Sequence, residues 1–142
     1  MMAPDLMTKA ARAVTSARLL LVAGDTDGAC NRAYYAMFAA ARAALWATRA
    51  PVEMEAVRTH SGLISAFSLQ LVKTGHVPIE LGRALNRAEE LRLIADYKGD
   101  PVEPAQAAWA VEQAEAFVDA MRAEFLPPSP SEESDAPGSL ES

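Results

Sequence analysis

The sequence predicts an all-α protein, an antiparallel up-and-down bundle of four to five helices. Ala, Leu, Arg, Glu and Met dominate the chain, and no stretch alternates between apolar and polar residues for long. Apolar residues instead recur at spacings of three and four, between glycines and prolines that end helices. Because the connections between neighbouring helices are short, antiparallel packing is favoured.

The first two helices have clear boundaries in the sequence. One is expected from about Asp5 to Ala23, since Gly24 suits the position just beyond a helix end. Thr26-Asp27 can cap the second, which should stop before Pro51. The apolar positions of this second helix share one face: Tyr34, Phe38, Ala41 and Leu45.

The next two helices follow the same pattern. Thr59 or Ser61 can cap a third helix that Gly75 closes, and a fourth should run from near Ile79 to about residues 97–99. The third carries the apolar face Leu63, Ile64, Phe67 and Leu71. The fourth carries the apolar stripe Leu81, Leu85, Ala88, Leu91 and Ala95.

The end of the chain divides into a helix and a tail. A fifth helix is expected from about Pro104 to Phe125, because proline fits the first helical turn. Residues 127–142 hold four prolines, five serines and one large apolar residue, a composition too polar to offset the entropy of ordering. We therefore expect one helical bundle over residues 1–126 and a disordered acidic tail.

Composition sets limits on function. The 142 residues are 51% hydrophobic and 23% charged, which suits one globular domain. The net charge of −6 argues against a protein that coats nucleic acid with general positive charge. However, the tail holds four acids and no base, while residues 32–98 hold nine basic and six acidic residues. A local site for phosphate groups is therefore compatible with the acidic total.

Several kinds of chemistry are disfavoured. With Cys30 alone there is no intrachain disulfide and no zinc site of several cysteines, and the two histidines lie sixteen residues apart. A glycine-rich phosphate loop, G-x-S-x-G and H-E-x-x-H are absent. We expect no metal and no cofactor. The longest strongly apolar run, residues 19–23, is too short for a membrane span, and no signal peptide precedes it, so a cytoplasmic protein is expected.

Polar residues inside the second helix are the first candidate for function. Asn31 precedes Arg32 and Tyr35, which are three residues apart and share a face. One interpretation is an amphipathic helix with a solvated arginine and core aromatics. The other is a polar face that lines a cleft or a subunit interface, with these three residues contacting phosphate or nucleic acid.

Two further groups lie at helix ends. Arg58 and His60 flank the start of the third helix, where free N–H groups favour anions, although an ordinary capping segment would look the same. Arg92 and Asp96 are four residues apart near the end of the fourth helix. Their spacing by itself indicates no more than a salt bridge.

Taken in order, these groups resemble the HEPN-domain superfamily, and within it small stand-alone members with a Tyr-Tyr-Ala-Met-Phe segment. The resemblance covers roughly residues 8–125. It is carried by Asn-Arg-x-Tyr-Tyr-Ala-x-Phe (31–38), Thr-His-x-Gly (59–62), Lys-Thr-Gly (73–75), Arg-x-x-Ala-Asp-Tyr (92–97) and Ala-Glu-Ala-Phe (114–117).

The resemblance implies a helical bundle that commonly forms a homodimer. Many members are metal-independent ribonucleases that act as toxins, often paired with a minimal nucleotidyltransferase as antitoxin. Catalysis in the family rests on an Arg, four to six residues, and then a His. The Arg would hold the scissile phosphate, and the His would move protons to or from the ribose 2′-hydroxyl and the leaving oxygen.

This chain matches that motif in part. Arg92 falls on the Arg position, but after four intervening residues the chain has Tyr97 in place of His. A phenol, which ionises near pH ~10, is a poor general base at neutral pH, although it can donate a proton or a hydrogen bond. His60 could substitute if the fold brings it beside Arg92. Tyr97 could also be a hydroxyl that a nucleotidyltransferase partner modifies.

Three hypotheses follow. The first is a toxin-type ribonuclease with a catalytic set of Arg92, Tyr97, Asp96 and His60 and phosphate contacts from Asn31, Arg32, Tyr35 and Arg58. The second is a non-catalytic HEPN dimer that binds a nucleotide, an RNA or a nucleotidyltransferase. The third is a purely structural bundle. Either of the first two predicts that Arg32, His60, Arg92 and Asp96 approach one another near a two-fold interface.

Overall fold

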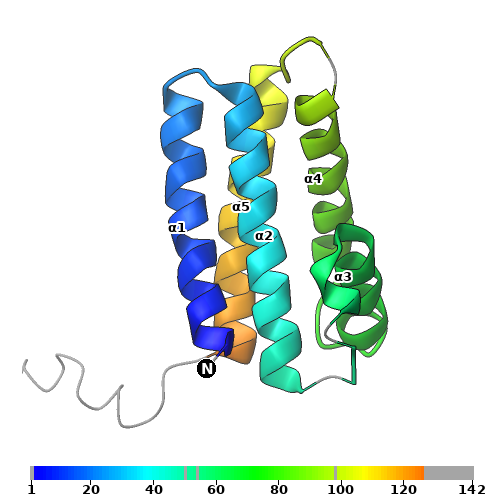
Figure 1. Ribbon diagram of the computed structural model, residues 1–142. Helices are drawn as coiled ribbons and strands as arrows, with labels where there is room; N and C mark the ends of the chain where they lie inside the picture. Colours follow the sequence, from blue (N-terminus) through cyan, green and yellow to red (C-terminus); the bar gives the residue numbers. More distant parts are fainter. Residues whose placement is uncertain (1, 50, 54, 98, 127–142) are drawn as a thin grey trace, which may run out of the picture.

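The computed structural model describes residues 2–49, 51–53, 55–97 and 99–126 (Figure 1). Within those residues every regular element is helical, and there is no strand. The elements are α1 (Met2–Val22), α2 (Thr26–Thr48), the 3₁₀ turn η1 (Ala56–Arg58), α3 (His60–Phe67), the π-helical turn η2 (Ser68–Val72), α4 (Ile79–Tyr97) and α5 (Pro104–Phe125).

Four long helices run alternately up and down, as the sequence predicts. In Figure 1, α1, α2, α4 and α5 form the bundle, and the short α3 lies beside α4 at one end of it. α2 has the central position, because it packs against α1, α5, α4 and α3. The predicted all-α up-and-down bundle is confirmed. The predicted tail, residues 127–142, lies outside the described residues.

The start of α2 differs by one residue from the prediction. The N-cap is Asp25, whose Oδ1 accepts a hydrogen bond from the backbone N–H of Gly28 at 2.8 Å, and Thr26 is already helical. Asp27 has another role, since its Oδ1 accepts the backbone N–H of Val102 at 2.8 Å. The predicted Thr26-Asp27 cap was therefore wrong, because Asp27 fixes the α4–α5 connection and leaves the capping position to Asp25.

The third helix shows a feature that apolar spacing did not reveal. Thr59 is its N-cap, and the Thr59 hydroxyl accepts the backbone N–H of Gly62 at 3.0 Å. The α-helical hydrogen bonding ends at Phe67, and the chain continues as the π-helical turn η2. Gly75, at φ +86°, then turns the chain toward α4, in the left-handed region that glycine enters without strain.

The core is rich in alanine. About half of the buried hydrophobic residues are alanines, and α2 supplies many of them. Small side chains allow helix axes to approach closely. Larger side chains fill the rest of the core, where Tyr34, Phe67 and Phe117 are fully buried. Phe67 and Phe117 bring α3 and α5 into aromatic contact, with ring centroids 5.5 Å apart.

None of the helices in the described part of the chain combines the length and the apolar content that crossing a membrane requires. The helices that matter for the candidate site are α2, α3 and α4. Their packing sets the polar end of α4 against the second and third turns of α2.

Candidate active site between α2, α3 and α4

Arg92 lies at the centre of a polar cluster on α4. Its side chain is only 13% exposed, which is low for an arginine. The guanidinium donates to Asp96 Oδ2 at 2.9 Å and to Glu89 Oε1 at 3.2 Å. Both carboxylates are on α4, three residues before and four residues after the arginine. Arg92 is therefore held in one position and has its charge compensated from two sides.

Asn31 joins this cluster to α2. Its amide Nδ2 donates to Asp96 Oδ1 at 2.9 Å, so each oxygen of the Asp96 carboxylate has a partner on a different helix. This bond links residues that are 65 positions apart in the sequence. It fixes the register between α2 and α4 at the level of Arg92.

The Tyr34 side chain contacts both Arg92 of α4 and His60 of α3. The Arg92 guanidinium carbon is 5.3 Å from the centre of the Tyr34 ring, within the range of a cation–π contact. The Tyr34 hydroxyl lies 2.9 Å from Nδ1 of His60. Burial raises the pKa of the Tyr34 phenol, and the nearby charge of Glu89 adds to this effect. The Tyr34 hydroxyl is therefore neutral and can donate to Nδ1 of His60 or accept from it, depending on the imidazole tautomer.

His60 is the first residue of α3 and is exposed at the surface. Its ring contacts two aromatic residues of α2, with centroids 5.3 Å from Tyr34 and 5.2 Å from Phe38. If Tyr34 donates to Nδ1, the neutral imidazole carries its proton on Nε2; if Nδ1–H donates to the hydroxyl, Nε2 can accept a proton. The imidazole is thus positioned on one side while its other nitrogen remains available to a ligand.

The structure brings together four of the eight residues that the sequence singled out, namely Asn31, His60, Arg92 and Asp96. The other four form no hydrogen bond or ion pair with these residues in the described part of the chain. The Arg32 guanidinium is 4.6 Å from the centre of the Tyr35 ring. Arg58 is exposed and lies 3.9 Å from Glu55.

Tyr97 directly follows Asp96 in the chain, but its side chain points largely into solvent. It is 78% exposed at the last residue of α4. Of the four residues expected to approach one another, Arg32 makes its contact with Tyr35 and not with the cluster.

Two residues that connect the cluster were not among the predicted site residues. Tyr34 was assigned to the apolar stripe of the second helix, although a buried tyrosine hydroxyl usually needs a partner. Glu89 stands three residues before Arg92, a spacing that places the two side chains on one helix face. Both signals were present in the sequence, but neither says which residues of other helices complete the cluster.

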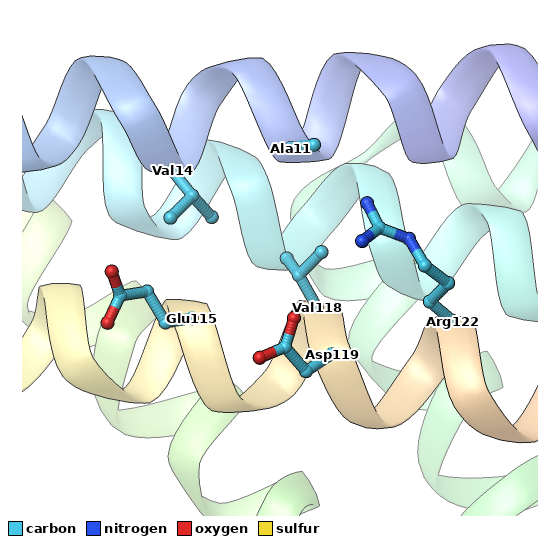
Figure 2. A pocket seen from close by; sticks show the side chains of 6 residues that line it. All are labelled: Ala11, Val14, Glu115, Val118, Asp119 and Arg122. Carbon is cyan, nitrogen blue, oxygen red and sulfur yellow. The ribbon is translucent and has the colours of Figure 1, made fainter. Parts of the chain in front are cut away.

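A hollow of about 380 Å³ lies on another side of the bundle, between α1 and α5. Figure 2 shows Ala11, Val14 and Val118 along it, with the charged side chains of Glu115, Asp119 and Arg122. Arg18 of α1 pairs with Glu115 nearby. No residue of the α2–α3–α4 cluster lines this hollow. Among the described residues, no group of three or more His, Cys, Asp or Glu could hold a metal ion.

The fold and the site define an all-α bundle in which one phenol, that of Tyr34, contacts both a guanidinium and an imidazole. Residues 3–124 match the HEPN domain family. The chain therefore belongs to the HEPN family, as the sequence motifs indicated.

Relatives of this chain support the same assignment. It is 41% identical over 95 residues to UPF0332 protein glr0978 of Gloeobacter violaceus, covering 67% of this chain and 71% of that protein. It is 37% identical over 116 residues to a UPF0332 protein of Thermotoga maritima, covering 80% and 83%. It is also 33% identical over 94 residues to a protein of Methanocaldococcus jannaschii named "Putative toxin MJ0605", covering 66% of each.

Proposed function

We propose that this protein is the toxin-type component of a toxin–antitoxin-like pair and a metal-independent ribonuclease. Membership of the HEPN family and a relative named as a toxin support the first part. The second part rests on one observation. Arg92 and His60 come from different helices and meet on the same Tyr34 side chain, so a cation and an imidazole share one site. That pair can replace the Arg and His of the family motif.

Cleavage of RNA without a metal requires both the imidazole of His60 and the guanidinium of Arg92. In cleavage without a metal, the ribose 2′-hydroxyl attacks the adjacent phosphorus, the bond to the 5′-oxygen breaks, and a 2′,3′-cyclic phosphate forms. The 2′-hydroxyl loses a proton and the 5′-oxygen gains one. In the tautomer whose Nδ1–H donates to the Tyr34 hydroxyl, Nε2 of His60 can accept the 2′-hydroxyl proton and, as imidazolium, return a proton to the 5′-oxygen, while a guanidinium can stabilise the charge on the phosphate oxygens.

Arg92 is compensated by two carboxylates, and a phosphate that displaces one of them takes over the donors it used. Asp96 is the more exposed of the two, at 30% against 18% for the Glu89 side chain. When an RNA phosphate takes the place of Asp96, Arg92 and Asn31 both present donors to it. In this proposal Asp96 holds the two donors in position until the substrate binds.

The same carboxylates favour a second candidate function. A HEPN dimer whose arginine stays paired with Glu89 and Asp96, and whose motif position holds Tyr97, binds a nucleotide, an RNA or a nucleotidyltransferase without cleaving anything. RNA cleavage in the presence of a chelator separates the two functions. The ribonuclease predicts cleavage that Arg92→Ala and His60→Ala abolish and that Arg12→Ala on α1 leaves intact. Absence of cleavage above the Arg92→Ala background, with binding retained, would support the binding module.

We also propose two partners. The exposed side chains of Leu93 (40%) and Tyr97 (78%) lie one turn apart on α4 and suit a homodimer contact beside Arg92. Sedimentation of Leu93→Glu should then show a monomer where the wild type shows a dimer. A wild type that sediments as a monomer at micromolar concentration would contradict the dimer.

The second partner is a minimal nucleotidyltransferase. The exposed Tyr97 hydroxyl can attack the α-phosphorus of a nucleoside triphosphate, with release of pyrophosphate and loss of the phenolic proton. Intact-mass measurement after incubation with a nucleotidyltransferase encoded beside this gene, magnesium and triphosphate should show one added nucleotide. The addition should be absent in Tyr97→Phe and present in Tyr35→Phe. Equal labelling of both variants would place the modification elsewhere.

A further inference from the structure

A hollow of about 240 Å³ lies where α3 and η2 meet the first turns of α4, and it is called the α3–α4 hollow below. Apolar side chains from all three elements line it: Ile64, Phe67, Val72, Ile79 and Leu85. Gly82 has no side chain to fill it, and a Cβ at this position would lie 3.2 Å from Val72. Ile79 is 51% exposed. No residue of the candidate active site lines this hollow.

Two cations stand beside these apolar side chains. Lys73 and Arg83 also line the α3–α4 hollow, and both are exposed. Neither forms an ion pair with a described residue. No acidic side chain is among the described residues that line the hollow. The ligand that fits this surface therefore combines an apolar group with negative charge, since it would cover the exposed isoleucine and pair the cations.

Other hollows on the described surface differ in charge. The hollow between α1 and α5 is lined by Glu115 and Asp119 as well as by one arginine, so it attracts an acidic ligand less. A hollow between α4 and α5 has Arg87 as the one charged residue among its described lining residues, and Arg87 already pairs with Glu90. The α3–α4 hollow is therefore the one that best suits an acidic ligand with an apolar group.

The sequence that follows α5 has the matching composition. Residues 127–142 hold four acids and no base. Their one large apolar residue, Leu140, directly precedes Glu141. A segment that is too polar to form a core of its own can still dock through a single apolar side chain and its neighbouring charges. This segment therefore carries both parts of the ligand that the α3–α4 hollow fits.

The hollow is also within reach of this segment. α5 ends at Phe125, at the same end of the bundle as α3 (Figure 1). α5 packs against α2, and α2 packs against α3. The axes of neighbouring helices lie roughly 8–10 Å apart, so the lateral path from α5 to α3 is about 20 Å. An extended chain over residues 127–140 spans about 40 Å, which is more than this path requires.

We propose that residues 127–142 dock on the α3–α4 hollow of the same chain, with Leu140 against the apolar side chains and the acids beside Lys73 and Arg83. Docking covers Ile79 and places negative charge beside both cations. Because one leucine and a few exposed ion pairs hold it, the segment exchanges between docked and free states, and salt favours the free state. This contact is independent of the ribonuclease function proposed above.

Paramagnetic broadening in NMR spectra of the full chain tests the contact. A nitroxide is attached to Ser139→Cys. Cys30 does not compete for the label, because it is buried and burial raises the pKa of its thiol to about 11. Methyl signals of Ile64 and Ile79 should weaken, whereas those of Val14 at the α1–α5 hollow should not. A mixture of nitroxide-labelled chains with methyl-labelled chains that carry no nitroxide detects docking on a second copy.

Four variants separate the contributions of the leucine and of the charges. Leu140→Ser should lower the ratio of docked to free chains about tenfold, because the leucine is no longer buried, and Leu140→Met should keep it. Arg83→Glu should also reduce the broadening, and adding Glu141→Lys to Arg83→Glu should restore it. Arg12→Glu on α1 is the control with the same change in net charge and should leave the broadening unchanged. Each substitution lies in residues 127–142 or at an exposed position, so the melting temperature should stay close to that of the wild type.

Two results would overturn the proposal: no selective broadening of Ile64 and Ile79 in the wild type, or broadening that is unchanged in both Leu140→Ser and Arg83→Glu. Broadening of equal size in the mixture of chains would assign the hollow to a second copy and would also overturn docking within one chain.

Discussion

The hydroxyl of Tyr34 and Nδ1 of His60 lie 2.9 Å apart, and this contact joins a buried residue of α2 to an exposed residue at the first turn of α3. The raised pKa of the buried phenol keeps it protonated at neutral pH. Because Nδ1 lies against this hydroxyl, Nε2 is the imidazole nitrogen that remains for a substrate. The contact also explains why a site residue lies on α3, a helix that is otherwise a short element at the end of the bundle.

Tyr34→Phe tests this relationship. Loss of the hydroxyl leaves the imidazole packed on two aromatic rings but free to exchange tautomers, so RNA cleavage should fall about tenfold, a typical cost of one positioning hydrogen bond. The measurement is the cleavage rate between pH 5 and 8. The control is Tyr35→Phe, which removes a hydroxyl outside the cluster. A Tyr34→Phe enzyme with wild-type rate and pH profile would show that the tautomer of His60 is not set here.

Asp96→Asn should strengthen binding of RNA to the cluster. The substitution removes one of the two negative charges beside Arg92, and an amide competes less well than a carboxylate with an incoming phosphate. We expect several-fold tighter oligonucleotide binding and a loss of about 0.5 kcal/mol in stability. Glu90→Gln is the matched control, because Glu90 pairs with the exposed Arg87 on α4. Equal gains in both variants would mean that only the net charge matters.

Stability should decrease at alkaline pH because of two buried groups. Burial raises the pKa of Cys30 to about 11, and the charge of Asp27 adds to this; burial also raises the pKa of Tyr34. The unfolded chain ionises both near their ordinary values, while the folded chain keeps them neutral. Stability is therefore complete below about pH 8.5 and is lost as the pH rises toward 11.

Urea unfolding at pH 8 and pH 11 measures this effect. The wild type should lose more stability between the two pH values than Cys30→Ala does, by about 2 kcal/mol, which follows from a shift of roughly two pKa units. The loss of packing in Cys30→Ala is the same at both pH values, so it cancels when the change in stability between pH 8 and pH 11 is compared. The same loss in both proteins would assign the alkaline transition to other groups.

Gly62→Ala should be strongly destabilising. A Cβ on Gly62 would collide with the backbone carbonyl of Ala56 and lie 2.6 Å from the Thr59 hydroxyl oxygen, so the η1–α3 junction would have to move. We expect a loss of more than about 2 kcal/mol, within the range of overpacked sites. Gly99→Ala is the control, because a Cβ there meets nothing within 4 Å. Equal melting temperatures for the two variants would contradict the collision expected at Gly62.

The cap of α2 gives a simple stability test. Asp25→Ala removes the side chain that accepts the Gly28 N–H, and should cost about 1 kcal/mol. Thr26→Ala should cost less than half of that, because Thr26 is already inside the helix. Urea unfolding of the two variants decides between them. Equal losses of unfolding free energy in the two variants would show that Thr26 also caps the helix.

Most of the fold could be predicted because single residues that favour helix ends mark where the helices begin and stop. Gly24, Gly75 and Pro104 mark the boundaries where the structure has them. The cap of α2 was wrong by one residue, because Asp25 and Asp27 are both good caps in sequence and only the tertiary bond to Val102 separates them. The π-helical turn after α3 could not be predicted, since Leu71 is buried as the α-helical spacing of apolar residues had already indicated.

The site was harder to predict for a different reason. Arg92 and Asp96 share a helix, so their spacing is sufficient to pair them. The contact of Asn31 with Asp96 and of Tyr34 with His60 depends on how α2, α3 and α4 pack, and one sequence does not contain that information. Arg32 illustrates the limit, because its stacking on Tyr35 is as compatible with the spacing as any contact with the cluster.

The many buried alanines of α1 and α2 reverse the usual sensitivity of a core to substitution. In most cores the damaging changes shorten a side chain, but Ala10, Ala13, Ala40 and Ala44 are fully buried and have little to lose. Each added methyl group must push two backbones apart, which costs about 1 to 3 kcal/mol. In a saturation scan of these positions, the protein should therefore remain folded with glycine or serine more often than with valine or leucine. The size of the side chain, and not its hydrophobicity, limits which residues can occur there.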